Sequence, residues 1–494
     1  MKKSSLSIIL FVFCVSFTKA QFKVDYNPSI QSKINIQYFT PKGDNLFVGD
    51  CIPFFNDGTY YLYWLLDKGH HSSLNGLGGH QWVLSTTKDL KNWTHYPIVI
   101  GIDEDWEKSI CTGSVAVYNK TYYAFYATRL INAEGKVNEQ LSYATSADGI
   151  HFRKQLPNPF YTSAPGYNKR NFRDPKVIID DSGVFHLFVS SSVENDYSVD
   201  SNRGCLVHLT SADLKTWKVN EPILSGQREV PECPDYFFWN GWYYLLYGQG
   251  GNTHYVMSKE KYGPWIEPKF QVFDEDWSNV VKTAEFINGR RIAASWIPSK
   301  KDNKDNGNEI FGGCILLREV VQLPDGTLTT KFPEEVVPKR GEKLNLNFIY
   351  DKNVNQINSN YYDINALGTI GSFHAANIPA KCRISFEVEA HGSNEEIGMF
   401  LRSTDKASEG YKLSFSANTK IVSLANTKIQ AVSGLDKPFK VDIILYDDII
   451  DVCINDQRCT VNRLSERKGD TIWFFAQHGK VTIKNIEIYP LLSE

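Results

Sequence analysis

The sequence lacks the features that mark several common classes of protein. Its 494 residues carry a formal net charge of −3, which provides no broad basic surface for nucleic acid or acidic lipid. No stretch after residue 20 is apolar enough to form a transmembrane helix. Helical periodicity is also missing beyond a turn or two. We therefore expect an all-β protein with no nucleic-acid partner and no membrane span.

Cysteines are few and widely scattered. Eight of the nine lie beyond residue 20, and none belongs to a C-x-x-C pair. Neither a dense disulfide framework nor zinc-ligand spacing is present, so we expect no structural metal and no cofactor. Cys453 and Cys459 flank a short turn, where a disulfide across a hairpin and two buried free thiols are both open.

The first twenty residues have the pattern of a secretory signal peptide. Two lysines precede an apolar run too short to span a bilayer, and small residues follow at Thr18 and Ala20. We expect cleavage before Gln21, which makes the mature protein secreted or periplasmic. A lipid anchor on Cys14 is the alternative, but the bulky Phe13 before it is atypical of a lipoprotein signal.

One motif, a turn followed by an aromatic-rich strand, returns about every sixty residues, near the blade period of propellers. Its five copies are D-G-T-Y-Y-L-Y-W (57–64), N-K-T-Y-Y-A-F-Y (119–126), S-G-V-F-H-L-F-V (182–189), N-G-W-Y-Y-L-L-Y (240–247) and N-G-R-R-I-A-A-S-W (288–296). After four copies a strand ends in Ser, a polar turn follows, and a large aromatic opens the next strand, at Trp93, Phe152, Trp217 and Trp265. The pattern predicts a five-bladed β-propeller, each blade with about four antiparallel strands, within residues 21–338.

The pattern of apolar and polar residues changes beyond Pro338. Segments such as R-I-S-F-E-V-E-A and K-V-T-I-K-N-I-E-I alternate apolar and polar residues between short turns. Such alternation is typical of sheets with one buried face. We predict a C-terminal β-sandwich over residues 341–494, with a structural role.

Three acidic residues stand just before repeat strands of different blades. Asp50 precedes the first, Asp174 the third and Glu232 the fourth. The innermost strand of each blade delivers residues to the central channel of a propeller, so all three should face one funnel. Glycoside hydrolysis needs two opposed carboxyl groups, which makes this set a candidate catalytic site. Capping of turns is the ordinary alternative for any one of them.

At this point the chain resembles glycoside hydrolase family 32, the invertases, inulinases and levanases. The resemblance rests on R-D-P at 173–175, on E-C-P-D at 232–235, and on C-T-G-S at 111–114 in place of the family's F-S-G-S. It implies a five-bladed propeller followed by a β-sandwich. It also implies an oligo- or polysaccharide substrate, with Asp50 as nucleophile, Glu232 as acid and then base, and Asp174 as a ligand of furanose hydroxyls.

The resemblance further implies that Arg173, Thr112 and Ser114 lie at the sugar, Arg173 neutralising one of the acids. Departures are concentrated in the first blade. Of the motif W-M-N-D-P-N-G only Asp50 and the nearby Pro53 remain, and Leu65 replaces a Gln. In the segment that follows only Gly78 and Trp82 are kept, and we expect Trp82 to contact the sugar. His80, beside Trp82, is a candidate replacement for the lost hydrogen bonds, as are His70 and His71.

We expect a secreted, retaining hydrolase of β-fructofuranosides, in which Glu232 has a raised pKa and Asp50 stays ionised at neutral pH. Two alternatives stay open. One is a hydrolase of another furanoside, such as an arabinofuranoside, which uses a wider inverting pair of acids. The other is a non-catalytic carbohydrate-binding propeller that lost turnover together with the nucleophile motif.

Overall fold

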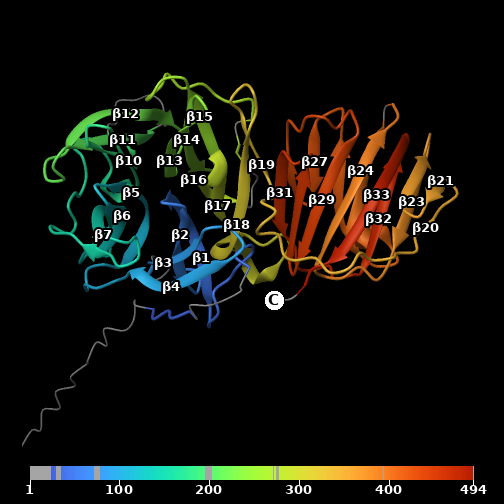
Figure 1. The fold of residues 1–494 in the computed structure, drawn as a ribbon, viewed down its shortest axis with the longest axis horizontal. Coiled ribbons are helices and arrows are strands. Elements are labelled where there is room, and N and C mark those ends of the chain that lie inside the picture. The colour runs from blue at the N-terminus through green and yellow to red at the C-terminus, as the bar shows by residue number, and fades with distance from the viewer. Residues whose placement is uncertain are drawn as a thin grey trace, which may run out of the picture.

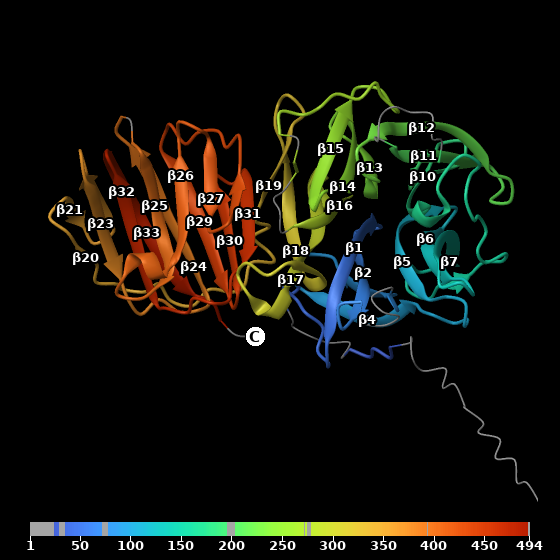
Figure 2. The same ribbon diagram turned by 180° about the vertical axis from the view of Figure 1, so that it is seen from behind.

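The computed structural model describes residues 24–28, 35–71, 78–194, 203–270, 272–273, 278–392 and 394–492. Within these ranges the chain is nearly all β: a five-bladed propeller is followed by a two-sheet sandwich, and helix is confined to short 3-10 turns. The two bodies lie side by side, with propeller strands coloured blue to yellow and sandwich strands orange to red (Figures 1 and 2). The predicted fold class is confirmed. The expected signal peptide lies outside the described residues.

The propeller blades follow one another along the chain as antiparallel meanders. Blade 1 has β1 (Leu46–Asn56), β2 (Thr59–Lys68), β3 (Gln81–Thr87) and β4 (Trp93–Ile100). Blade 2 has β5 (Ser109–Tyr118), β6 (Thr121–Ile131), β7 (Val137–Ser146) and β8 (Arg153–Lys154). Blade 3 has β9 (Arg173–Ile179), β10 (Phe185–Ser192), β11 (Gly204–Ser211) and β12 (Lys218–Gln227), with the 3-10 turn η2 (Lys169–Asn171) before it.

The last two blades depart slightly from this plan. Blade 4 has three strands, β13 (Glu232–Trp239), β14 (Trp242–Gln249) and β15 (Asn252–Ser258), and isolated bridges to Ile266 and Val272 stand where a fourth would pair. Blade 5 has β16 (Asn279–Glu285), β17 (Arg291–Lys300), β18 (Glu309–Gln322) and β19 (Leu328–Lys331), with η3 (Ile287–Gly289) and η4 (Lys301–Asn303) in its turns. A bridge between β1 and β18 joins blade 5 to blade 1.

The predicted polar turns between the outer strands are closed by aspartates. Asp148 shows the pattern, since its Oδ1 accepts the backbone N–H groups of Ile150 and His151, both at 2.9 Å. Asp89 and Asp213 accept equivalent pairs of N–H groups in their own blades. Short polar side chains that satisfy the backbone in this way explain why Ser or Thr followed two residues later by Asp recurs at these turns, at 87–89, 146–148 and 211–213.

Every innermost strand of the propeller contains a β-bulge at the same height. In each, two residues oppose a single residue of the second strand: 49–50, 111–112, 174–175, 233–234 and 280–281. Asp174 and Cys233, the first residues of their bulges, have positive φ angles of 53° and 49°, and each precedes a proline. Proline fits there because the extra residue of a bulge has no N–H bond to lose. The bulges re-aim the side chains on which the site depends.

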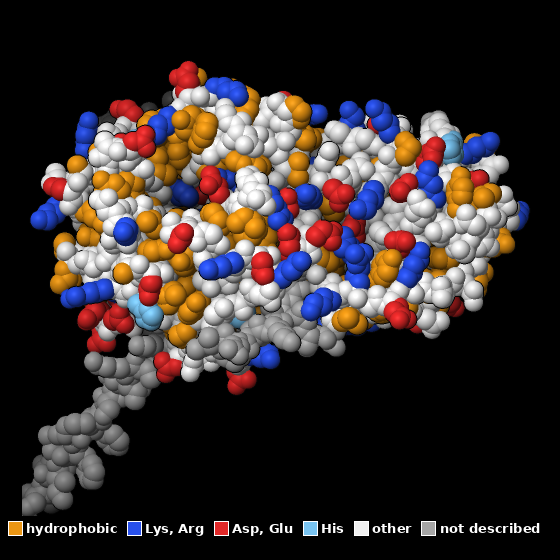
Figure 3. Space-filling view, in the orientation of Figure 1, with side chains coloured by type: hydrophobic (Ala, Val, Ile, Leu, Met, Phe, Trp, Pro, Cys, Tyr) orange, Lys and Arg blue, Asp and Glu red, His pale blue; other side chains and the backbone are white. Residues whose placement is uncertain are grey.

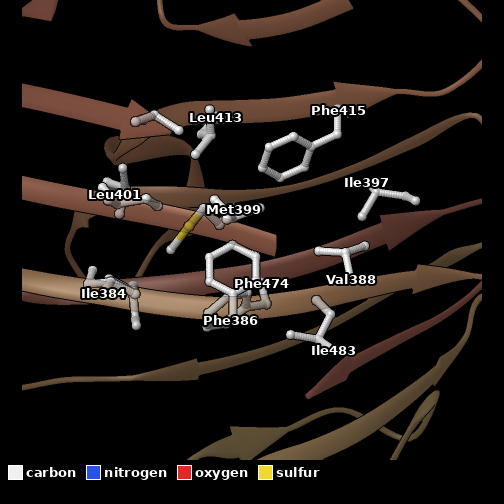
Figure 4. Close-up of a cluster of buried hydrophobic side chains, with 14 of the residues drawn as sticks. Ile384, Phe386, Val388, Ile397, Met399, Leu401, Leu413, Phe415, Phe474 and Ile483 are labelled. Atoms are coloured by element: carbon white, nitrogen blue, oxygen red, sulfur yellow. The ribbon is translucent and has the colours of Figure 1, made fainter. Parts of the chain in front are cut away.

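The sandwich consists of two seven-stranded sheets. The first has the order β20 (Ile349–Tyr350), β23 (Ile370–Ala375), β32 (Thr471–Gln477), β25 (Glu396–Ser403), β26 (Tyr411–Ser416), β27 (Ile421–Leu424), β28 (Thr427–Ile429). The second has the order β21 (Val354–Asn358), β22 (Tyr361–Asn365), β33 (Lys480–Pro490), β24 (Cys382–Ala390), β29 (Phe439–Tyr446), β30 (Ile449–Ile454), β31 (Arg458–Arg463). The turn η5 (Ala407–Glu409) lies between β25 and β26. Side chains such as Phe386 and Met399 face each other between the sheets in one continuous core (Figure 4).

A buried ion pair fastens the sandwich to the propeller. Arg318 of β18 donates from both terminal nitrogens to Asp451 of β30, at 2.8 and 2.6 Å, and Tyr38 donates its hydroxyl to the same carboxylate. An apolar cluster at this contact includes Cys453 and Cys459, which lie directly opposite each other on β30 and β31. Both are buried free thiols in the structure, the second of the two arrangements that the sequence left open.

Charges of both signs are interspersed over the face that Figure 3 shows, and no patch of one sign covers it. In the part of the chain that the structure describes, no helix has the length and apolarity that a membrane crossing requires.

Candidate active site

A pocket of about 610 Å³ opens where the bulged inner strands converge, and Asp50, Asp174 and Glu232 all line it. They come from β1, β9 and β13, so three different blades each supply one acid. Volume does not single this pocket out, because a hollow of about 630 Å³ lies along the sandwich. Its distinction is the set of three carboxyl groups.

The three acids hold neighbouring rather than identical places in the repeat. Glu232 stands just before its bulge, Asp174 is the first bulge residue, and Asp50 is the second residue of its own bulge. The three acids, which the sequence places just before repeat strands, therefore lie within one residue of the position of Asp174 in the repeat. This stagger lets carboxyl groups from three blades reach one pocket.

Asp50 is held from two sides. Trp296 of β17 donates its indole N–H to Asp50 Oδ1 at 3.1 Å, and the thiol of Cys233 lies 3.7 Å from Oδ2. Burial raises the pKa of Asp50 to about 7, and the carboxyl groups of Asp174 and Glu232 add to the rise, against the buried Lys282.

Asp174 is locked by the neighbouring blade. The backbone N–H of Cys233 donates to Asp174 Oδ2 at 3.1 Å, and Arg173 Nε lies 3.5 Å from the same oxygen. Only 4% of Asp174 is exposed, so this carboxylate has one fixed orientation. A rigid acceptor of this kind suits the binding of hydroxyl groups.

Arg173 lies among the acids and links them. Its Nη2 donates to Glu232 Oε1 at 2.6 Å, and its Nη1 lies 3.5 Å from Glu139 and donates to Asn171 at 2.7 Å. Burial alone would lower the pKa of Arg173, but Asp174, Glu139 and Glu232 raise it above its ordinary value. The guanidinium therefore stays charged and allows several carboxylates to share a small volume.

Glu232 is the most accessible of the three acids, with 49% of its side chain exposed. Partial burial raises the pKa of Glu232, Arg173 opposes the rise, and Asp174 adds to it. The expected direction is found for Glu232, whereas the expectation that Asp50 stays fully ionised at neutral pH is not met. A pKa of about 7 leaves about half of Asp50 protonated at pH 7. The physical reason is that Asp50 is the more deeply buried of the two and faces two other acids.

The remaining predicted sugar contacts divide into two groups. Arg173, Thr112 and His80 line the pocket. Trp82 and Ser114 lie outside it. Trp82 is fully buried and donates its indole N–H to the carbonyl of Cys111, and Ser114 bonds across the blade junction to the carbonyl of Pro175 and the N–H of Val177. Both are corrected to structural residues, because they face neighbouring sheets rather than the funnel.

The histidines of blade 1 also divide. His71 and His80 line the pocket. His70 does not, because its ring stacks on Phe47 and its Nδ1 donates to the carbonyl of Phe311 at 2.8 Å.

The structure adds pocket residues that the sequence did not indicate. Arg129 of β6 donates to Glu139 of β7 at 2.9 Å, and both line the pocket beside Arg173. Trp296 and Phe311 form an aromatic pair at 4.7 Å on the blade 5 side. Trp296 ends the fifth copy of the repeat, and that signal would have found it. Arg129 and Glu139 follow no repeated pattern.

Below the pocket, buried polar bonds tie the blades together. Asp235 accepts from Lys176 of blade 3 at 2.7 Å and from the backbone N–H of Thr283 of blade 5 at 2.8 Å. Lys282 of blade 5 donates to the carbonyl of Gly113 of blade 2 at 2.8 Å. The floor is thus cross-linked between blades, which fixes the relative positions of the acids above it.

Solved structures share this architecture over almost the whole chain. Fructan 1-exohydrolase IIa from Cichorium intybus superposes with a TM-score of 0.71 at 15% identity, over 94% of this chain and 98% of that one. A beta-fructofuranosidase from Bombyx mori superposes with a TM-score of 0.65 at 16% identity, over 93% and 95%. The chain is therefore a propeller-plus-sandwich protein of the fold found in these hydrolases.

Sequence comparison identifies the family. Residues 51–325 match the model of the glycosyl hydrolases family 32 N-terminal domain, which is more than half of the chain. The chain belongs to glycosyl hydrolase family 32. The match begins immediately after Asp50, in line with the altered nucleophile motif.

Individual relatives are distant. A sucrose-6-phosphate hydrolase from Zymomonas mobilis is 24% identical over 294 residues, 54% of this chain and 56% of the relative. A levanbiose-producing levanase from Geobacillus stearothermophilus is 25% identical over 269 residues, 53% of this chain and 59% of the relative. The chain thus spans somewhat more than half the length of the curated relatives it matches.

Proposed function

We propose that this protein is a secreted, retaining glycoside hydrolase of β-fructofuranosides, such as sucrose or fructans. The observation that carries the proposal is the convergence of Asp50, Asp174 and Glu232, from three blades, on one pocket. Membership of family 32 and relatives named as levanase and sucrose-6-phosphate hydrolase support fructosides as the substrate class.

The proposed reaction uses the three acids in separate roles. Asp50 attacks the anomeric carbon while Glu232, close to the pocket mouth, protonates the leaving oxygen. Glu232 then takes a proton from the water that releases the sugar. Asp174 accepts hydrogen bonds from furanose hydroxyls, and Arg173 holds Glu232 and Asp174 at a fixed spacing.

The environment supports this division of labour. Glu232 is partly exposed, so it can exchange protons with solvent between the two steps. The indole N–H of Trp296 stabilises the charged form of Asp50 and orients it. The raised pKa of Asp50 implies that its ionised, attacking form is well populated only at pH values near neutrality and above.

An assay with sucrose, inulin, levan and arabinan, read by identification of the released sugar, tests the proposal. We expect fructose or fructo-oligosaccharides from at least one of the first three. Arabinose from arabinan would instead favour the arabinofuranoside alternative. No release by the wild type, together with sugar binding that Asp174→Asn weakens, would favour the non-catalytic alternative.

Export is a separate part of the proposal, and the N-terminal sequence supports it. We expect the chain recovered outside the cytoplasm to begin at Gln21, which N-terminal sequencing measures. A chain retained in the cytoplasm with Met1 in place would contradict it.

A further inference from the structure

Beside the carboxyl groups, a second set of side chains converges on the wall of the same pocket. Asp67, His71 and His80 each offer one donor atom, and these three atoms all lie within 4.8 Å of one another. Asp67 comes from β2, His71 from the turn that follows it, and His80 from the residue before β3. None of the three belongs to the proposed acid trio.

Asp67 is the unusual member of the set. Its exposed fraction is 0%, and its Oδ1 accepts the backbone N–H of His71 at 2.8 Å and faces His80 Nε2 at 3.2 Å. Its other oxygen, Oδ2, is buried and accepts no hydrogen bond from the described residues. A buried carboxylate oxygen is costly unless a hydrogen-bond donor or a cation satisfies it, and a cation can do so here.

Both histidines are supplied by constrained backbone. The N–H of His80 donates to Ser109 Oγ at 3.1 Å, and its carbonyl accepts the N–H of Ile110 at 2.9 Å, which fixes it to blade 2. His71 has a φ angle of 61° and its ring packs 3.8 Å from Phe311. The cluster is thus built by three fixed segments rather than by flexible surface side chains.

We propose that Asp67, His71 and His80 form a binding site for a divalent transition-metal ion of the zinc type. Two imidazoles and one carboxylate are typical ligands of such ions, whereas calcium and magnesium prefer oxygen alone. A histidine ligand binds the metal through a neutral ring nitrogen. With ligand distances of about 2.0–2.2 Å, tetrahedral donor atoms lie about 3.4 Å apart, so donor atoms that are up to 4.8 Å apart here would move closer together around the ion.

The geometry leaves the ion with an open position. His71 and His80 line the sugar pocket, whereas Asp67 lies behind them. Three protein ligands with one free position are typical of zinc sites that contact small molecules. This feature rests on the proposed function: the open position would take a sugar hydroxyl in the blade where the family's own polar side chains are replaced. The ring of Phe311 contacts both histidines and Trp296. Since Trp296 donates to Asp50, Phe311 links the proposed metal site to the proposed nucleophile.

Metal binding is tested without any sugar. Purified full-length protein is stripped with a chelator, and Zn²⁺ affinity is measured by competition with a chromophoric chelator. We expect one Zn²⁺ per chain, a melting temperature that rises with Zn²⁺, and d–d absorption bands of a low-symmetry site when Co²⁺ is substituted. His71→Ala and His80→Gln should each weaken Zn²⁺ binding at least about 100-fold.

His95→Gln is the matched control. His95 lies in the same blade, is buried, and bonds to Ser85 rather than to the cluster. This variant should keep wild-type Zn²⁺ affinity. Wild-type affinity no higher than that of folded His71→Ala, or an equal loss in His95→Gln, would overturn the site.

A second measurement examines the open position. Added fructose should shift the Co²⁺ bands of the wild type. If Zn²⁺ binds but fructose leaves the bands unchanged while the enzyme still cleaves fructosides, the metal site stands and its contact with the sugar is refuted. If fructosides are not cleaved yet Zn²⁺ binds as described, the proposed function fails and the metal site stands.

Discussion

The propeller and the sandwich use the same device, the β-bulge, for opposite purposes. In the sandwich a bulge in β25 gives Arg402 a φ angle of 54° and turns its guanidinium inward, where it donates to the backbone carbonyls of Leu464 and Ile449. In the propeller the bulges turn Asp50 and Asp174 toward an open pocket. One bulge satisfies buried backbone, and the others leave acids available for chemistry.

Buried charges are also treated differently in the two regions. Asp442 of the sandwich faces the guanidinium of Arg383 at 2.5–3.2 Å, and Asp451 has a bidentate partner in Arg318. Asp50 instead receives an indole N–H and stands beside two further carboxyl groups. In the sandwich each of these buried carboxylates is paired with an arginine, which stabilises the fold. In the propeller funnel the surroundings of Asp50 instead destabilise its ionised form, as is common at functional sites.

The largest expected effect is on turnover, from Asp50→Asn. Removing the attacking oxygen while keeping the shape should lower kcat on the best fructoside by about 10⁴-fold or more. Steady-state assays on purified variant and wild type measure it, and circular dichroism checks that the variant is folded. Turnover near the normal rate would show that Asp50 is not the nucleophile.

Glu232→Gln should have a large effect that depends on the leaving group. Loss of general acid catalysis should lower kcat on sucrose by about 10²–10⁴-fold. The first step on an aryl fructofuranoside with an acidic phenol should be much less affected, because that phenolate needs no proton. Equal losses on both substrates would contradict the role of Glu232 as the acid.

Asp451→Asn, a change in the sandwich, should affect stability and not turnover. It leaves Arg318, whose side chain is 2% exposed, without its carboxylate, which should lower the free energy of unfolding by about 3–5 kcal/mol. Urea denaturation measures the change. The kcat of the folded variant should stay within a few-fold of wild type, because the sandwich has a structural role. A folded Asp451→Asn protein with abolished turnover would show that the sandwich contributes to catalysis.

A smaller effect concerns pH and stability together. Folding raises the pKa of Asp50 to about 7. Between about pH 4 and 7 Asp50 is ionised in the unfolded chain but still largely protonated in the folded chain, so the free energy of unfolding of the wild type falls as the pH rises through this range. Asp50→Asn has no such penalty and should be more stable than wild type by about 2 kcal/mol at pH 8, a value reduced for partial exposure. Near pH 4 the difference should vanish. A gain that does not depend on pH would rule out this cause.

The same groups predict a bell-shaped pH profile. The active form of the enzyme needs Asp50 ionised and Glu232 protonated. Because both pKa values are raised and the two groups interact, the two apparent pKa values of the pH profile describe the pair and not the single residues. The value of kcat/KM should fall at low pH, where Asp50 becomes protonated, and at high pH, where Glu232 loses its proton. A flat profile from about pH 4 to 9 would contradict the pairing.

The sequence predicts those parts of the fold that repeat. Five turn-and-strand copies predicted five blades, and the polar turns before Trp93, Phe152, Trp217 and Trp265 predicted the outer hairpins, because each obeys local rules. The only sequence signals for the bulges of the inner strands are Pro175 and Pro234, each of which lies in one of them. Trp82 was misplaced because an aromatic on a propeller strand can face either the funnel or the next sheet, and one residue of shift decides which.

Contacts between separate segments could not be predicted. Arg129 and Glu139 meet across two strands of one blade, and Asp67 and His80 meet across a turn with no repeated counterpart. The pKa of Asp50 likewise depends on depth in the pocket, which no local pattern encodes.

The most direct test of the account is to trap the covalent intermediate. In Glu232→Ala, an activated aryl fructofuranoside should still react with Asp50, but release should be slow because no base activates water. Mass spectrometry of the quenched enzyme should find one added anhydrohexose on the peptide that contains Asp50, and none in Asp50→Asn. A retaining mechanism of this kind requires the carboxyl groups of nucleophile and acid to lie about 5–5.5 Å apart. Phenol released in a burst with no adduct on any peptide, or an adduct at another residue, would contradict the assignment of Asp50 as the nucleophile of the funnel.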